Sequence, residues 1–190
     1  MTCSPKIAAI VLAAGLSTRS GPVNKLLHSV DGKVMVRSVV DLLTAVPIDP
    51  VIVVTGFEAL KIEAALSGCP VIFVHNSAFE HGMGGSIGCG VAALADDVDG
   101  VLICLGDMPH VNTDTIHRLC EAFKHGGIYV PIKGGRHGNP VLFAREHFKA
   151  LTALNGDRGG KAVIQRNALR VQDVPVDDDG IFIDHDLVGV

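Results

Sequence analysis

The chain has 190 residues, of which 48% are apolar and 19% charged, which is enough apolar material for one domain around a single core. A formal net charge of −4, no tryptophan and one tyrosine leave neither a basic field nor stacking platforms, so we expect no nucleic-acid partner. No apolar run approaches the ~20 residues of a membrane span, and the five cysteines are dispersed without a C-x-x-C pair, so we expect a cytoplasmic protein with reduced thiols and no membrane partner.

Short apolar runs rich in branched residues alternate with amphipathic stretches from the N-terminus onward. The runs predicted as strands, buried on both faces, are residues 7–12, 51–54, 71–74, 101–105 and 128–131. The stretches predicted as helices are residues 33–45, 57–66, 86–95 and 113–125. This order, with right-handed crossovers, predicts a doubly wound parallel sheet. The edge at the carboxyl ends of its strands, where ligands bind, is then shared by loops 13–25, 55–56, 75–85 and 106–109.

The last third of the chain departs from this alternation. Residues 129–133 and 140–143 are strand-like and are separated by the glycine-rich residues 134–139, which favours a hairpin over a crossover. Helical patterns follow at 145–153 and 160–167, then short strands at 171–176 and 181–183. No linker or repeat divides the sequence, so residues 1–190 are predicted to form a single domain.

The loop after the first predicted strand combines small residues with two cations. Residues 12–25 read LAAGLSTRSGPVNK. Small residues let backbone N–H groups approach an anion, and Arg19 and Lys25 can neutralise its charge, which favours binding of a nucleoside triphosphate. Neither the Walker pattern nor the G-x-G-x-x-G dinucleotide fingerprint is present. A solvated loop is the alternative interpretation.

An aspartate follows the predicted strand 101–105. Asp107 should project from the strand end into the same edge, where its carboxylate suits Mg²⁺ as a hard oxygen ligand. The alternative is that Asp107 caps the helix that begins near Thr113, although Asn112 and Thr113 lie closer to that start. The acidic residues 177–179 beside Gly180 are typical of a turn.

Polar and glycine residues also follow other predicted strands. Ser86 opens a predicted helix behind three glycines (82, 84 and 85) whose free N–H groups would attract an anionic group, but a plain N-cap explains Ser86 equally well. Thr55 and Gly56 could hold the edge of a base or merely end a loop. Residues 134–140 and 155–160, rich in glycine and arginine, suit a second anionic substrate or are simple turns. The nine histidines lack the spacing of a zinc site.

These motifs, in this order and over nearly the whole chain, resemble the nucleotidyltransferase family that includes the molybdenum-cofactor cytidylyltransferases and guanylyltransferases. The family signature is L-A-[AG]-G-x-S-x-R-x-G followed by lysine, and the later matching segments are residue 76 with residues 82–86, 105–109, 135–143 and 154–160. The cytidylyltransferase branch is favoured because Ala14 stands where guanylyltransferases typically carry glycine, and because the Gly-Asp-Arg-Gly at residues 156–159 is typical of that branch. The resemblance implies an α/β, Rossmann-like fold of the nucleotide-diphospho-sugar-transferase (GT-A-like) type, with a doubly wound, mostly parallel sheet and one antiparallel strand.

The resemblance also implies a reaction, in which CMP passes from Mg-CTP to the molybdopterin cofactor to give molybdopterin cytosine dinucleotide and pyrophosphate. The recipient of this product would be a xanthine-dehydrogenase-type molybdoenzyme. Arg19 and Lys25 are the implied catalytic residues and Asp107 is the implied metal ligand. A second metal ligand is expected from the C-terminal segment, at Asp186 or alternatively Asp184, although only the start of the family's Asp-x-Asp-Thr-Pro-Glu-Asp pattern is present.

The implied contacts with the two substrates fall into two sets. The nucleotide-binding residues are Leu12, Ala13, Ala14, Gly15, Lys25, Thr55, Gly56, Asn76 and Ser86. The residues that bind the molybdopterin cofactor are Arg136, Gly138, Asn139, Asp157 and Gly159. Family members often carry histidine where this chain has Asn139.

Three alternative functions stay open at this point. The first is the same chemistry with GTP, which would make the chain a guanylyltransferase. The second is an NAD(P)H-dependent oxidoreductase, because a dye-reducing branch belongs to the same broad family and many dehydrogenases share the fold. The third is a non-catalytic cofactor-binding protein, and the shortened C-terminal acidic pattern favours this alternative.

Overall fold

A mixed sheet forms the middle of the protein in the computed structural model, which describes residues 4–16 and 24–185. The sheet has eight strands, in the order β10-β7-β9-β6-β1-β4-β5 with β8 paired to β7. Their bounds are β1 Ile7–Ala13, β4 Val51–Thr55, β5 Ile72–His75, β6 Gly100–Leu105, β7 Ile128–Lys133, β8 Arg136–His137, β9 Val141–Ala144 and β10 Val171–Pro175. The chain places β4 and β5 on one side of β1 and β6 on the other, which is the doubly wound arrangement that the sequence predicts.

One strand of the main path runs against the others. β9 pairs antiparallel with both β6 and β7, whereas the pairs β1–β4, β1–β6, β4–β5 and β7–β10 are parallel. The predicted hairpin over residues 129–143 is confirmed, because β7 turns back through β8 into β9. The mostly parallel α/β sheet with an antiparallel strand is therefore also confirmed.

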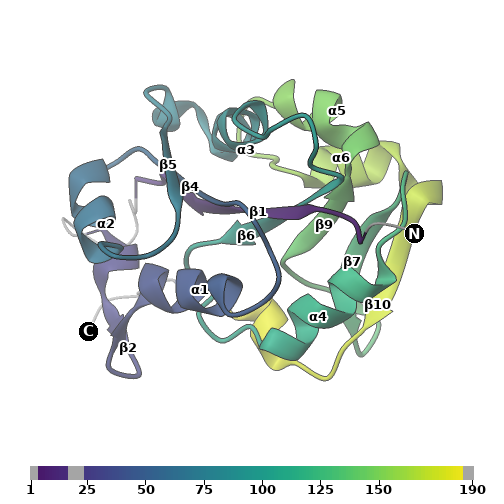
Figure 1. Ribbon diagram of the computed structural model, residues 1–190, viewed down its shortest axis with the longest axis horizontal. Coiled ribbons are helices and arrows are strands. Elements are labelled where there is room, and N and C mark those ends of the chain that lie inside the picture. The colour runs from purple at the N-terminus through teal and green to yellow at the C-terminus, as the bar shows by residue number, and fades with distance from the viewer. Residues whose placement is uncertain (1–3, 17–23, 186–190) are drawn as a thin grey trace.

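Helices cover both faces of the sheet (Figure 1). One layer holds α1 (Met35–Thr44), α2 (Ala59–Ala65) and α4 (Thr113–Ala122); the other holds α3 (Met83–Ala92), α5 (Phe148–Thr152) and α6 (Lys161–Arg166). Successive side chains of β1 enter opposite layers, since Ala9 and Val11 pack with α1 while Ile10 packs with α3. The two cores follow from this alternation, and within the described residues no helix has the length and apolar character needed to cross a bilayer.

The edge strand β5 corrects one expectation. Its residues were expected to be buried on both faces, but Ile72 is 53% exposed and Phe73 is 37% exposed. β5 lies at the end of the strand order with only β4 beside it, so one backbone edge has no neighbouring strand in the described part. An apolar run in an α/β sequence does not reveal whether its strand is central or peripheral.

The segment at residues 181–183 corrects a second expectation, because it is not a strand. A 3₁₀ turn, η5, spans Asp179–Phe182, and the Asp178 side chain accepts a hydrogen bond of 2.8 Å from the Gly180 N–H. Such a local side-chain bond competes with extended structure. The expected turn at residues 177–179 is thus longer than the sequence indicates.

A small two-stranded ribbon, β2 (Ser29–Val30) with β3 (Lys33–Val34), was not expected. Its second strand occupies the start of the predicted helix 33–45, so that α1 begins at Met35. The Asp31–Gly32 turn between the two strands explains the ribbon, since both residues have positive φ.

The described cysteines, Cys69, Cys89, Cys104 and Cys120, are free thiols.

Candidate functional site

The carboxyl ends of β1 and β6 form the point where the strand order reverses. Gly106 donates its N–H to the carbonyl of Leu12, Phe57 donates to Ala14 and Asn76 donates to Thr55, at 3.2, 3.2 and 2.8 Å. These bonds join the ends of neighbouring parallel strands at one edge. The four loops predicted to share this edge therefore do so where the structure describes them. Ala13 and Ala14 are buried there, Leu12 is half-buried and Gly15 is exposed.

The two groups predicted to handle phosphate charge and metal meet at this edge. Lys25 Nζ lies 2.6 Å from Asp107 Oδ2, and each side chain is 17% exposed. Asp107 lies in the turn that directly follows β6, and Lys25 begins the 3₁₀ turn η1 (Lys25–Leu27) that closes the loop after β1. The ammonium and carboxylate thus converge although 82 positions separate them in sequence. Arg19, the other predicted catalytic residue, and Asp186, the other predicted metal ligand, lie outside the described residues.

Asn24 is a site residue that the sequence reasoning missed. Its side chain is fully buried; Oδ1 accepts a 3.1 Å bond from the Leu26 N–H, and Nδ2 donates to the Phe57 carbonyl at 3.3 Å. It caps η1 and ties the loop after β1 to the loop after β4, which holds Lys25 facing Asp107. An asparagine just before a lysine at a loop end is the signal that could have found it.

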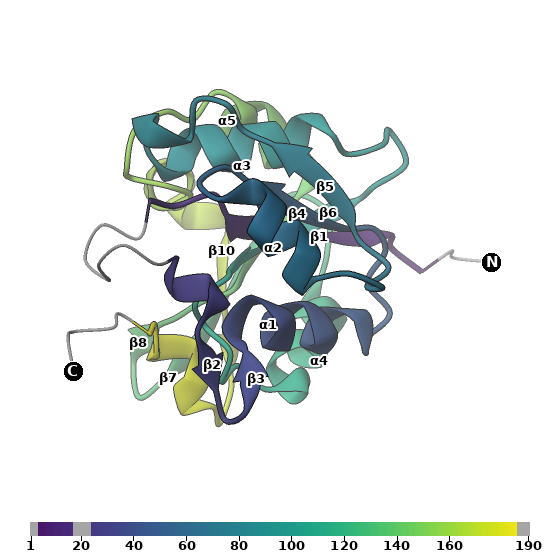
Figure 2. The same cartoon turned by 90° about the vertical axis from the view of Figure 1, so that its left-hand side faces the viewer.

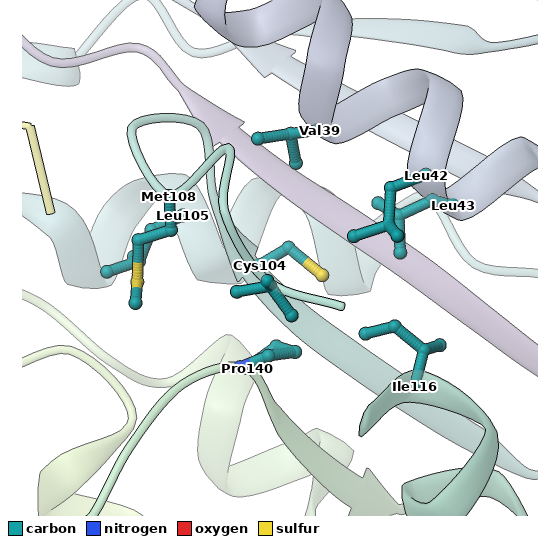
Figure 3. A pocket seen from close by; sticks show the side chains of 9 residues that line it. Val39, Leu42, Leu43, Cys104, Leu105, Met108, Ile116 and Pro140 are labelled. Atoms are coloured by element: carbon teal, nitrogen blue, oxygen red, sulfur yellow. The ribbon is translucent and has the colours of Figure 1, made fainter. Parts of the chain in front are cut away.

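An apolar pocket behind the edge explains the methionine of the Gly-Asp-Met-Pro motif. Met108 is 4% exposed and enters a pocket formed by β6, α1, α4 and Pro140 (Figure 3). Its burial anchors the loop beside Asp107, whose carboxylate faces Lys25. Cys104 lies in the same pocket, and burial raises the pKa of its thiol far above the ordinary value, so this group stays protonated.

The donor set around Asp107 fits magnesium better than a metal held by protein alone. The described residues contain no group of three or more histidine, cysteine or acidic side chains that could hold an ion. Mg²⁺ is commonly bound by one or two carboxylates, with water and substrate phosphates completing the shell. A single half-buried carboxylate beside a lysine at a strand-order reversal meets that requirement when a triphosphate is bound.

The polar residues predicted to contact the nucleotide form a buried network instead of an open surface. Asn76 Nδ2 donates to Ser86 Oγ at 3.1 Å, and Asn76 Oδ1 accepts from the Ala78 N–H at 3.0 Å. Thr55 is fully buried and its hydroxyl lies 3.5 Å from His75 Nδ1. Ser86 lies inside α3, whose N-cap position is Gly82, so the N-cap alternative for Ser86 is wrong. The contact of Thr55, Asn76 and Ser86 with a nucleotide stays a prediction. The same holds for Gly56, which packs against the Phe79 side chain.

Gly82 and Gly84, at the start of α3, serve close packing. Gly84 was expected to offer a free N–H, but it donates to the Gly156 carbonyl at 2.8 Å. A Cβ on Gly84 would lie between 2.8 and 3.0 Å from backbone atoms of Asn155, and a Cβ on Gly159 would lie 2.8 Å from Met83 Sδ. The segment 155–160, with Asp157 beside Gly82, therefore rests directly on the N-terminal turn of α3.

We expect Gly84→Ala to lower the free energy of unfolding by about 1–3 kcal/mol, because the new methyl group has no space. Gly85→Ala is the matched control: its Cβ would lie 3.6 Å from Asn76 Nδ2, an ordinary contact, and alanine favours the helix. Urea unfolding of both variants measures the difference. Equal loss in the two variants would contradict the packing role of Gly84.

Comparison with known proteins agrees with this geometry. The sequence model of the MobA-like NTP transferase domain matches residues 9–172, from β1 into β10. The chain belongs to the MobA-like NTP transferase family. The matched domain is thus of the nucleotidyltransferase class, and its fold is that of the nucleotide-diphospho-sugar transferases.

Individual solved structures and relatives are also similar to this chain. A solved nucleotidyl transferase from Methanothermobacter superposes with a TM-score of 0.83 at 25% identity, covering 96% of this chain and 94% of its own. A manganese complex of Rv0371c from Mycobacterium tuberculosis gives 0.74 at 26% identity, over 90% of this chain and 88% of the other. The bifunctional protein GlmU of Bifidobacterium longum is 40% identical over 119 residues, which are 60% of this chain. The matched region spans about a quarter of that relative's length, 26%.

The residues predicted to bind the second substrate of this transferase lie in two places. Asp157 and Gly159 are in the segment on α3, whereas Arg136, Gly138 and Asn139 follow β7 near the C-terminal segment. Arg136 lies 4.5 Å above the ring of Phe182, and the Asn139 N–H donates to the Ile181 carbonyl at 3.0 Å. A Cβ on Gly138 would lie 2.6 Å from Ile181 atoms. Each of these residues thus has a packing role in the structure, and its contact with a cofactor remains a prediction.

Proposed function

We propose that this nucleotidyltransferase moves CMP from Mg-CTP to the terminal phosphate of the molybdopterin cofactor, releasing pyrophosphate. The observation that carries the proposal is the approach of the Lys25 ammonium to the Asp107 carboxylate at the reversal of strand order. A cation for phosphate oxygens and a carboxylate for a divalent ion are the two charges that transfer from a nucleoside triphosphate requires. The loop motif and the residues 156–159 support the cytidylyltransferase branch.

The acceptor phosphate is anionic and needs no general base, so catalysis depends on orientation and charge neutralisation. Mg²⁺ held by Asp107 would neutralise charge on the triphosphate. Lys25 would bind the α-phosphate and Arg19 the β- and γ-phosphates, with backbone N–H groups of residues 13–15 around them. The ammonium exchanges its contact with Asp107 for phosphate oxygens when the substrate binds, so the ion pair keeps both side chains placed beforehand.

The residue at position 14 supports a pyrimidine over a purine. The Ala14 methyl group is 3% exposed and lies close to Gly56, where an added Cβ would be 2.9 Å from it. A glycine at this position would leave more room between the loops after β1 and β4. The narrower space between these loops favours cytosine over guanine.

Pyrophosphate release tests the function directly. The purified chain is incubated with magnesium, molybdopterin cofactor and each nucleoside triphosphate in turn, with a sample lacking the cofactor as control. We expect cofactor-dependent release with CTP well above that with GTP. Greater release with GTP would favour the guanylyltransferase, and cofactor binding without release would favour a binding protein. Oxidation of NAD(P)H in a separate incubation, without pyrophosphate release, would favour an oxidoreductase.

A further inference from the structure

The C-terminal strap, defined here as residues 177–185, lies along the loop that carries Asp107. The two segments meet in opposite directions: Asp178 contacts Asn112, Gly180 packs on His110, and the His185 N–H donates to the Asp107 carbonyl at 3.0 Å. A Cβ on Gly180 would overlap the His110 carbonyl, so the two backbones are in direct contact. Figure 2 shows the yellow end of the described chain beside β8, at the same edge of the sheet.

A buried carboxylate fixes one end of this contact. Asp178 is 4% exposed; its Oδ2 accepts from the Asn112 N–H at 2.8 Å and from the Thr115 hydroxyl at 2.7 Å, and its Oδ1 accepts from the Gly180 N–H. Asn112 is the N-cap residue of α4, yet its own side chain makes no capping bond. Asp178 therefore caps α4 from 66 positions away, where the helix dipole favours a negative charge.

The exposed contacts of the strap are weaker than this buried one. Lys133 pairs with Asp177 and Asp179 at 2.9 Å each, but those carboxylates are 98% and 77% exposed. Solvent and salt screen such pairs, whereas hydrogen bonds to a buried charge are roughly twice as strong as neutral ones. Asp178 is thus the buried charged contact that ties the strap to the start of α4.

We infer that Asp178 is a positioning residue for Asp107. It holds the start of α4 and the strap together, and the strap holds the Asp107 backbone through His185, so the loop 107–112 is fixed at both ends. The Asp107 carboxylate is then held facing Lys25 before a substrate arrives. The inference rests on the proposed function, in which Asp107 binds the divalent ion.

Binding of Mn²⁺ in the presence of CTP, followed by electron paramagnetic resonance, tests the inference apart from turnover. We expect Asp178→Asn to weaken Mn²⁺ binding about 10-fold, the range seen when a partner of a metal ligand is removed. Asp179→Asn is the matched control, because it makes the same charge change one residue away at an exposed site; its affinity should stay that of the wild type. In turnover assays, the KM for Mg²⁺ should rise in Asp178→Asn more than the KM for CTP.

Thr115→Val keeps the test decisive if Asp178→Asn does not fold. It removes one of the donors to Asp178 and should weaken Mn²⁺ binding less, and Thr115→Ser should restore the affinity. Wild-type affinity in folded Asp178→Asn, or in Thr115→Val when Asp178→Asn does not fold, would overturn the inference. A wild-type protein that binds no Mn²⁺ with CTP would instead overturn the metal role assigned in the proposed function.

Discussion

Lys25→Met is expected to lower the rate of pyrophosphate release by about 10²–10³-fold, the usual effect of removing one group that stabilises transition-state charge. Methionine keeps much of the length of the side chain but cannot neutralise phosphate oxygens. The ammonium also lies 2.6 Å from Asp107 before substrate binds, so its loss removes a positioned charge rather than a mobile one. Steady-state release of pyrophosphate from CTP measures the effect.

The control for this prediction is Lys61→Met, because Lys61 is 65% exposed on α2 and pairs with Glu58. Its activity should match that of the wild type. A double variant, Lys25→Met with Asp107→Asn, should lose less activity than the two single effects multiplied together, since the two groups act on the same phosphates. If Lys25→Met unfolds at the same temperature as the wild type and keeps full activity, Lys25 has no role in the reaction. The proposed function would then lose its main support.

Phe143→Ala is expected to lower the free energy of unfolding by about 3–5 kcal/mol. Phe143 is 1% exposed in β9, lies opposite Val101 of β6 and Ile128 of β7, and touches the start of α6 near Gly160. Its removal leaves a cavity where the antiparallel strand joins the two parts of the sheet.

Differential scanning calorimetry should show this loss as a decrease in Tm of roughly 6–20 °C for a domain of this size. Leu169→Ala is the comparison, because Leu169 is 98% exposed and its loss should change stability by at most about 0.5 kcal/mol. Equal shifts in the two variants would show that β9 does not hold the core as described.

Local pattern sufficed for the central strands β1, β4 and β6 and for the convergence of Lys25 and Asp107. β1, β4 and β6 follow from apolar runs, and the rule for connections between parallel strands brings Lys25 and Asp107 to one edge. The same reasoning could not separate two uses of glycine in α3, because a missing Cβ permits both anion binding and close packing. Only the position of Asn155 decides that Gly84 serves packing.

The contacts of the C-terminal strap could not be predicted from the sequence. Nothing local indicates that Asp178 caps α4, since its partners are contributed by another part of the chain. The exposure of β5 likewise depends on the strand order rather than on its composition. Arg19 and Asp186 lie outside the described residues, so their roles remain predictions from the family pattern.

The antiparallel strand β9 joins two parts of the sheet that carry different functional segments. The part built on β1, β4, β5 and β6 carries Lys25 and Asp107, while β7 to β10 carry the turn at residues 134–139 and lead into the strap. Because β9 joins them through regular backbone pairing, which tolerates many side chains, the turn at residues 134–139 can vary in sequence and length without disturbing that pairing. Such modularity would let one triphosphate-handling scaffold serve acceptors of different shape.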